Sequence, residues 1–238
     1  VLEIGPGFGV LTKSLAENAP KVVSVEIDPR LNEILGYTLS DFDNVKIINS
    51  DVLKTDLHKL ICEEFGEKKI SVAANLPYYI TTPIITRLLE EKLNIKNIVV
   101  MVQKEVARRM QAKPSTKDYG AITLLCRYYT KPSIVTDVPA GLFVPPPKVD
   151  SAVLKLEILP EPSVKVLDEK TFFKTVRAAF SQRRKTLLNC LSASFPIPKE
   201  ILSQILISAD IEPSRRGETL DISEFGALSD KIFGYIKQ

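Results

Sequence analysis

The sequence predicts an α/β fold, in which a doubly wound parallel sheet is followed by a small all-helical carboxyl-terminal domain. Through residues 1–102, short apolar runs typical of buried strands alternate with amphipathic segments of helical length. This rhythm is typical of a parallel sheet with helices on both faces. Beyond the proline-rich stretch LPEPS at 159–163, strand patterns end and helical periodicity continues to the end of the chain.

The individual elements follow from the same patterns. Apolar runs predict strands at 1–4, 22–25, 45–48, 70–74 and 97–102, with helices between them at about 9–18, 29–38, 55–65 and 82–92. A charged helix is predicted at 104–112 and an apolar helix near 120–129. Two later strand-like segments, PSIVTDVP and SAVLKLEIL, can pair antiparallel across the turn-rich FVPPPKVD. We therefore expect a first domain over 1–160 and a helical domain over 164–238.

The composition excludes several classes of protein. The chain has 238 residues, of which 45% are hydrophobic and 26% charged, and no apolar stretch approaches the roughly 20 residues of a membrane span. The three cysteines are isolated, without a CxxC pair, which fits a reducing cytoplasm and argues against a structural metal site. Nothing in the sequence requires an oligomer, so we expect a cytoplasmic monomer without metal.

The net charge of +3 falls entirely within residues 163–238, where it is clumped in RRK at 183–185 and RR at 215–216. Clumped basic residues are a mild indication of nucleic-acid binding. On charge alone, a solvated helix face is the simpler interpretation.

A glycine loop, EIGPGFG at 3–9, occupies the first predicted strand-to-helix turn. Glycines there let the backbone approach a ligand at a helix amino terminus. Glu26 ends the next strand, where a carboxylate can accept both hydroxyls of a ribose. The spacing is Gly5-x-Gly7-x-Gly9, which departs from the G-x-G-x-x-G pattern of dinucleotide sites.

Asp51 closes the third predicted strand, where it can accept a hydrogen bond from an adenine amino group. Acidic residues placed to bind a ribose and an adenine, without a binding site for a pyrophosphate, favour an adenosyl ligand such as S-adenosylmethionine over NAD. The simpler interpretation of Asp28 and Asp51 is that they cap helices. Glu26 and Asp51 end two successive strands, and together they favour the interpretation as ligand-binding residues over helix caps.

The stretch NLPYYITTP follows the fourth predicted strand. An adenine amino nitrogen is a poor nucleophile, and an enzyme that methylates it needs acceptors for its two N–H bonds. The side chain of Asn75 and the carbonyl of Leu76 can be these acceptors, while Pro77 fixes the turn. Tyr78 can stack on an unstacked base. A strand-end proline turn with a half-buried tyrosine is the simpler alternative.

Several motifs together resemble one family, the small-subunit (16S) ribosomal RNA adenine N6,N6-dimethyltransferases. These motifs are EIGPGFGVLT, VEID, SDVL, NLPYYITTP, FVPPPKVDSAV, AAFSQRRKTL and RRGETLDISEF, and they extend over nearly the whole chain. The related 23S RNA methylases of antibiotic resistance share the first motifs and the NLPY core but lack the last two signatures.

The resemblance implies a Rossmann-like methyltransferase domain and a helical RNA-binding domain. It also implies transfer of four methyl groups to two adjacent adenosines near the 3′ end of 16S ribosomal RNA during small-subunit maturation. Carried over by motif, the residues expected to hold S-adenosylmethionine are Glu3, Gly5, Gly7, Glu26, Asp51 and Asn75.

Asn75, Leu76, Pro77 and Tyr78 are expected at the reaction centre, and Phe180 is a candidate to face the target adenine opposite Tyr78. A core phenylalanine is an equally good interpretation of Phe180. Arg183, Arg184 and Lys185 are expected to bind RNA. The family's amino-terminal segment, with a GQNFL-like motif that helps close the cofactor site, has no counterpart in this sequence, and we expect the natural start to lie upstream.

Two other functions stay open at the level of sequence. A non-catalytic RNA-binding assembly factor could keep the fold and lose the chemistry, although the intact NLPY stretch argues against a dead site. An NAD oxidoreductase would need an acid or base for hydride transfer. The single histidine, His58, is expected on a surface helix, which disfavours this alternative.

Overall fold

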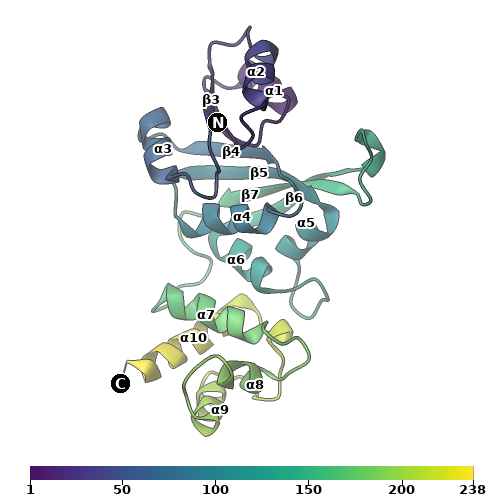
Figure 1. Cartoon of the computed structure of the whole chain (residues 1–238). Coiled ribbons are helices and arrows are strands. Elements are labelled where there is room, and N and C mark those ends of the chain that lie inside the picture. The colour runs from purple at the N-terminus through teal and green to yellow at the C-terminus, as the bar shows by residue number, and fades with distance from the viewer. Residues whose placement is uncertain (238) are drawn as a thin grey trace. The chain divides into compact units, whose positions relative to one another are not determined.

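The computed structural model describes residues 1–237, which form two compact units (Figure 1). The sheet unit consists of Val1–Ala107 and Lys131–Ile158, and the helical unit consists of Arg108–Thr130 and the residues from Leu159 onwards. These limits differ from the predicted 1–160 and 164–238 in one respect, because segment 108–130 belongs to the helical unit. Its aromatic side chains pack on helices that come later in the chain.

The sheet unit is built on one seven-stranded sheet. Its strands are β1 (Leu2–Ile4), β2 (Val22–Glu26), β3 (Val45–Asn49), β4 (Ile70–Asn75), β5 (Ile95–Gln103), β6 (Thr130–Val138) and β7 (Ser151–Ile158), and their order is β3-β2-β1-β4-β5-β7-β6. The first five strands are parallel, as predicted, and β7 pairs antiparallel with β5. β6 lies beside β7 at the sheet edge.

The apolar runs of the sequence become the buried centre of this sheet. Every residue of β1 and β2 is buried, which explains why these strands read as continuous rather than alternating patterns. The helices that begin in the sheet unit are α1 (Val10–Asn18), α2 (Leu31–Thr38), α3 (Leu57–Phe65), α4 (Thr81–Glu90) and α5 (Lys104–Gln111). A short 3-10 turn, η1 (Ala140–Leu142), precedes the proline-rich loop before β7.

The strand order reverses next to β1. The chain runs from β1 outward to β2 and β3, returns to β4 on the other side of β1, and continues outward to β5. In open α/β sheets, ligand crevices lie at the carboxyl ends of the strands at such a switch point. The residues at the carboxyl ends of β1 and β4 are therefore the first candidates for a ligand site.

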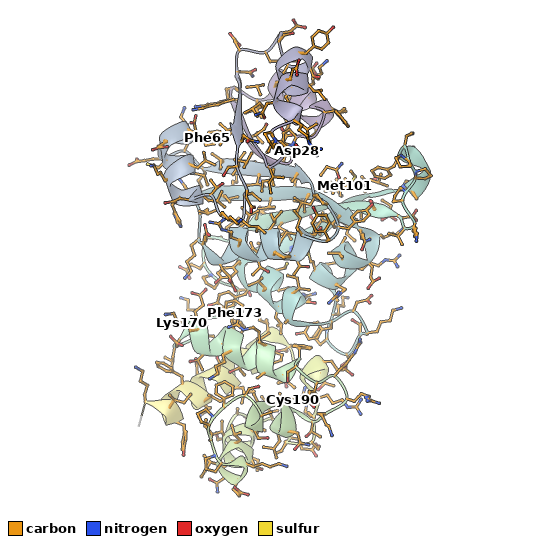
Figure 2. The ribbon with its side chains drawn as sticks, in the orientation of Figure 1. Asp28, Phe65, Met101, Lys170, Phe173 and Cys190 are labelled. Carbon is orange, nitrogen blue, oxygen red and sulfur yellow. The ribbon has the colours of Figure 1, made fainter. Side chains whose placement is uncertain are left out.

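The helical unit contains α6 (Ala121–Tyr129), α7 (Glu169–Ala179), α8 (Leu187–Ser192), α9 (Lys199–Ser208), η2 (Gly217–Thr219) and α10 (Ile222–Ile236). Its core is aromatic: Tyr128 stacks on Phe172 with ring centroids 4.9 Å apart and meets Phe173 edge-on at 5.1 Å. Phe173 and Cys190 mark α7 and α8 in Figure 2. Within residues 1–237, no helix is long and apolar enough to cross a membrane.

Aspartate side chains fix where two of these helices begin. Asp168 accepts a hydrogen bond from the Thr171 backbone at the start of α7. Asp221 accepts from Ser223 and Glu224 at the start of α10, and the Glu224 carboxylate bonds back to the Asp221 N–H. This reciprocal pair is a capping box, which satisfies backbone donors that the helix leaves free.

Candidate functional site

The glycine loop and the NLPY stretch meet at the same edge of the sheet. β1 and β4 are parallel neighbours, and Ile4 lies opposite Ala74. The next residues of the two strands are Gly5 and Asn75, so the predicted cofactor loop and the predicted reaction centre begin side by side. The adjacency follows from the register of two buried strands, and it lies at the switch point of the sheet.

The glycine loop needs glycine because of its backbone angles. Gly5, Gly7 and Gly9 have φ values of +69°, +57° and +86°, which side-chain-bearing residues rarely adopt. A Cβ at Gly5 or Gly7 would meet no atom within 4 Å. The loop is therefore bordered by open space, which suits a ligand held against the backbone.

Glu26 supports the loop from the end of β2. Its side chain is 5% exposed, one carboxylate oxygen accepts the Asp28 N–H at 2.9 Å, and the other lies 3.3 Å from the Gly7 nitrogen. Each oxygen of a carboxylate has two lone pairs, so both retain one for a further donor. Glu26 can hold a ribose and fix the glycine loop at once.

Glu3 is completely buried at the base of the same loop. Its Oε2 accepts hydrogen bonds from the hydroxyls of Thr12 at 2.8 Å and Ser24 at 2.6 Å, whereas Oε1 has no protein partner. Burial raises the pKa of Glu3 above its ordinary value, against the lowering effect of the Ser24 and Thr12 hydrogen bonds, and the nearby Glu26 raises it further. Glu3 thus ties β1 to β2 and α1 beneath the loop.

Asp51 follows β3 and is half-buried. Its Oδ1 accepts the Leu53 N–H at 2.9 Å, and its Oδ2 lies 3.7 Å from the Lys54 Nζ. The residue that caps α3 is Asp56, which accepts from the Lys59 backbone. Asp51 therefore stabilises a turn after β3 and does not cap a helix.

The NLPY stretch turns from β4 into α4. Leu76 is buried and donates its N–H to the Met101 carbonyl of β5 at 3.3 Å, while Asn75 stays exposed. The Pro77 carbonyl accepts from the Ile80 N–H at 3.2 Å and closes the turn. Met101 is labelled on β5 in Figure 2. The anchored leucine thus holds the asparagine amide at the strand end.

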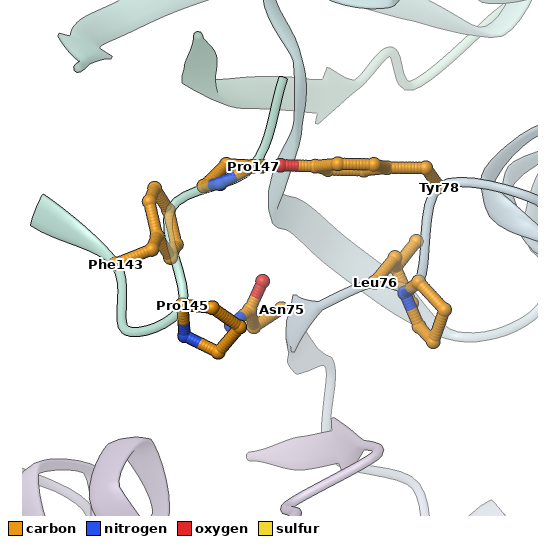
Figure 3. A pocket seen from close by; sticks show the side chains of 7 residues that line it. Asn75, Leu76, Tyr78, Phe143, Pro145 and Pro147 are labelled. Carbon is orange, nitrogen blue, oxygen red and sulfur yellow. The ribbon is translucent and has the colours of Figure 1, made fainter. Parts of the chain in front are cut away.

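Tyr78 lies across a cavity from the proline-rich loop before β7. The residue is 37% exposed, and its hydroxyl lies 2.9 Å from the hydroxyl of Ser151, the first residue of β7. The cavity has a volume of about 280 Å³ and is lined by Asn75, Leu76, Pro77, Tyr78, Phe143, Pro145 and Pro147. Figure 3 shows the Asn75 amide between the Tyr78 ring and the Phe143 and Pro145 side chains.

The remaining predicted residues belong to the helical unit. Phe180 directly follows α7 as its C-cap residue, and its ring centroid lies 5.8 Å from that of Tyr119 and 6.0 Å from that of Phe225. Arg183, Arg184 and Lys185 are exposed in the loop between α7 and α8, so the alternative of a solvated helix face is wrong in its geometry. His58 is exposed on α3, as predicted.

Comparison with known proteins decides the family. Residues 1–228 match the family model described as ribosomal RNA adenine dimethylase. This chain belongs to that family. The predicted enzyme class, a ribosomal RNA adenine methyltransferase with a Rossmann-like sheet and a carboxyl-terminal helical region, is confirmed by this membership and by the fold.

Curated members of the dimethylase family are similar over nearly the whole chain. The ribosomal RNA small subunit methyltransferase A of Alkaliphilus metalliredigens is 52% identical over 98% of this chain and 81% of its own length. The protein of that name from Bacillus cytotoxicus is 54% identical over 97% of this chain and 80% of its own length.

Two solved structures of RNA-modifying or adenosine-modifying methyltransferases share the fold. A dimethyladenosine transferase from Plasmodium falciparum superposes with a TM-score of 0.78 at 28% identity, covering 99% of this chain and 89% of that one. The 23S rRNA methyltransferase ErmE gives 0.68 at 27% identity, covering 98% of this chain and 90% of that one.

Sequence reasoning missed one wall of the dimethylase's cavity. Phe143, Pro145 and Pro147 come from FVPPPKVD, which was predicted as a turn and as part of a family motif but not as part of the site. Three consecutive prolines two residues after an aromatic residue are rigid and unlike an ordinary hairpin loop, and this was the available signal. The sequence motif alone does not show that this loop lines the cavity. The loop is brought to the site because β7 pairs with β5 in the sheet.

Proposed function

We propose that this dimethylase transfers methyl groups from S-adenosylmethionine to the N6 amino groups of two adjacent adenosines near the 3′ end of 16S ribosomal RNA. The observation that carries the proposal is the exposed Asn75 amide, which ends β4 next to Gly5 of the glycine loop and lines the cavity between Tyr78 and Phe143. The small-subunit relatives, at 52–54% identity, support 16S RNA over 23S RNA, since the 23S methylase is 27% identical.

The residues around the glycine loop fit the cofactor. The open space beside Gly5 and Gly7 accepts its methionyl part, Glu26 has free lone pairs for the ribose, and Asp51 lies at the next strand end for the adenine. Glu3 holds the loop from below. When bound, S-adenosylmethionine supplies a methyl group already activated by a positively charged sulfur, so no strong base is needed before attack.

The cavity residues prepare the target base. Asn75 accepts one N–H of the adenine amino group through its side-chain oxygen, and the Leu76 carbonyl accepts the other. These two hydrogen bonds draw the nitrogen towards tetrahedral geometry and aim its lone pair. Tyr78 stacks on one face of the base that has left its helix, worth roughly 1–3 kcal/mol. The ring of Phe143, on the opposite wall, contacts the base from the other side.

The helical unit supplies the contacts to the rest of the RNA. Arg183, Arg184 and Lys185 are exposed together, and cations of this kind bind phosphates through charge and hydrogen bonds. The phosphate contacts hold the RNA in register, while the cavity selects the base.

Replacing Asn75 with alanine tests the chemistry. We expect transfer to undermodified small subunits to slow by about 10²–10³-fold, because a positioned polar group at the reacting atom is lost. Affinity for S-adenosylmethionine should change little. Asn32→Ala, on exposed α2 of the same unit, is the matched control. Rapid-quench methyl transfer, with mono- and dimethyladenosine separated by mass spectrometry, gives both rates.

The outcome also separates the alternatives. An Asn75→Ala protein that produces dimethyladenosine at the unmutated rate would make the amide structural and overturn the proposed mechanism. A wild-type protein that binds small subunits but methylates no adenosine would be the non-catalytic assembly factor. Methylation found only on 23S RNA would identify the antibiotic-resistance activity instead.

A further inference from the structure

Three segments of the helical unit that are distant in sequence lie against one another. They are the loop 113–119 before α6, the segment 180–187, which is the loop between α7 and α8 with the first residue of α8, and the segment 215–220 that contains η2. Leu187 donates its N–H to the Arg215 carbonyl at 2.7 Å, and the Tyr119 hydroxyl donates to the Leu220 carbonyl at 2.8 Å. Segment 215–220 is therefore bonded to both other segments.

Glu218 and Arg183 sit where the three segments meet. The Glu218 backbone carbonyl accepts the Ser115 N–H at 2.8 Å, and its carboxylate lies 3.6 Å from the Arg183 Nε. The Arg183 guanidinium also donates to the Lys117 carbonyl. The ion pair joins the second and third segments, and hydrogen bonds of the same two residues reach the first; we call the Arg183–Glu218 pair the clasp.

The surroundings of the clasp are tightly fitted. A Cβ at the buried Gly217 would lie 2.8 Å from the Ala179 carbonyl oxygen, so the segment has no room for a larger residue. Ser115 has φ +65°, a left-handed conformation that costs a serine free energy unless its surroundings hold it. Its bond to the Glu218 carbonyl is such a restraint.

Exposed cations surround the clasp on all three segments. Lys113 and Lys117 lie on the first loop, Arg184 and Lys185 on the second, and Arg216 beside η2. Arg183 is exposed as well, but it also bonds to the Lys117 carbonyl and the Glu218 carboxylate, so it has a positioning role beside its phosphate contact. A surface whose exposed cations come from three segments is complementary to a chain of phosphates, which presents its negative charges at regular intervals.

We propose that these three segments form one phosphate-binding surface for RNA, in which Lys113 and Lys117 bind together with Arg184 and Lys185, and in which the clasp positions the first loop. The inference rests on the proposed function, because it assumes that the helical unit binds ribosomal RNA. It extends the predicted RNA contacts to the loop 113–119, and it makes Arg183 and Glu218 positioning residues.

For the Glu218→Ala variant, the clasp and simple electrostatics predict opposite changes in RNA binding. Glu218→Ala removes a negative charge from a basic surface, which by charge alone should tighten RNA binding. We expect binding of undermodified small subunits to weaken several-fold, because Arg183 loses the carboxylate that holds its guanidinium against the Lys117 carbonyl, while the backbone bond from Ser115 to residue 218 remains. Glu200→Ala, an exposed acid in the first turn of α9, is the matched control. Hydrogen exchange of residues 113–119 should be faster in Glu218→Ala and unchanged in Glu200→Ala.

The lysines are tested in a separate variant that leaves the clasp intact. Lys113→Ala with Lys117→Ala should weaken subunit binding and make the plot of log K against log salt shallower by about 1–2 units, the change for one or two lost phosphate contacts. Lys199→Ala with Lys231→Ala removes the same charge from other exposed positions of the unit and should leave the slope unchanged.

Each result has one meaning. Equal or tighter binding by Glu218→Ala would overturn the clasp, and an unchanged salt slope in the double lysine variant would overturn the extended surface. Both can happen while the wild-type protein still binds subunits and loses affinity when Arg184 and Lys185 are replaced. Failure of that wild-type binding would instead overturn the proposed function.

Discussion

At the scale of single residues, two buried carboxylates support the candidate site. Glu26 fixes the glycine loop through Gly7 and Asp28 and keeps lone pairs for a ligand, while Glu3 ties β1 to its neighbours from a fully buried position. A side chain that is already held by hydrogen bonds within the protein is preorganised. Less free energy is therefore lost in ordering it when a ligand binds.

Glu26→Gln should weaken S-adenosylmethionine binding by about 1.5–3 kcal/mol, because charge-assisted hydrogen bonds to the ribose are lost while the side chain keeps its size. Glu17→Gln, on the exposed face of α1, removes the same charge without touching the loop and should have no effect. Isothermal titration calorimetry measures both. Equal affinities in the two variants would remove Glu26 from the cofactor site.

The two candidate aromatic residues for the target base are separable by mutation. Phe143→Ala should slow methyl transfer about tenfold or more with little loss of stability, because its half-buried ring lines the cavity. Phe180→Ala should mainly destabilise the helical unit, by about 1–3 kcal/mol, because its ring packs on Tyr119 and Phe225.

Thermal unfolding and methyl transfer, measured on both phenylalanine variants below their melting temperatures, distinguish these roles. The reverse pattern, with a folded but inactive Phe180→Ala protein and an active Phe143→Ala protein, would favour the prediction from family resemblance that Phe180 faces the adenine.

At the scale of elements, the sheet order brings the two walls of the cavity together. β4 carries NLPY, β5 pairs with both β4 and β7, and β7 begins at Ser151 directly after the proline-rich loop. The Tyr78–Ser151 hydrogen bond joins the walls. On the other side of the sheet, a charged cluster joins an α3 carboxylate to the strands: Glu64 binds Lys21, next to β2, at 2.9 Å and Lys46 of β3 at 2.5 Å.

Glu64→Gln should lower the free energy of unfolding by about 0.5–1 kcal/mol at neutral pH, a small value because both lysines are partly exposed. The Lys46 and Lys21 hydrogen bonds hold the pKa of Glu64 below its ordinary value of 4.5. The stabilisation is therefore complete above pH 4.5 and is lost as the pH falls through the folded-state pKa.

Urea unfolding of the wild-type and Glu64→Gln proteins across this pH range measures the difference. Glu63→Gln is the control, since the Glu63 side chain is exposed and lies 3.8 Å from its partner Lys59. A stability difference for Glu64→Gln that does not change between neutral and acidic pH would contradict the assignment of this effect to the ionised carboxylate.

At the scale of the whole molecule, local patterns in the sequence predicted most elements, and tertiary packing decided the rest. The parallel strands were predictable because strands buried on both faces read as apolar runs, and the glycine loop because three positive φ angles require glycine. Glu26 and Asn75 followed from their places at strand ends.

Three features could not be read from local patterns. Phe143 reaches the cavity through an antiparallel pairing that no local pattern specifies. The basic residues 183–185 lie in a loop because α7 ends at Ala179, which Gly217 contacts closely from a distant segment. Segment 108–130 belongs to the helical unit because Tyr128 finds its aromatic partners in α7.

The discontinuity of the helical unit has a consequence for the protein's synthesis. The sheet unit has its last strand once residue 158 has left the ribosome, so its sheet can form while the rest of the chain is still being made. Within the helical unit, however, Tyr128 of α6 stacks on Phe172 of α7, and α7 to α10 are all translated after the last strand of the sheet unit. We expect the apolar face of α6 to stay exposed to solvent until α7 has been made. This face is therefore the place where we expect a chaperone to bind the nascent chain.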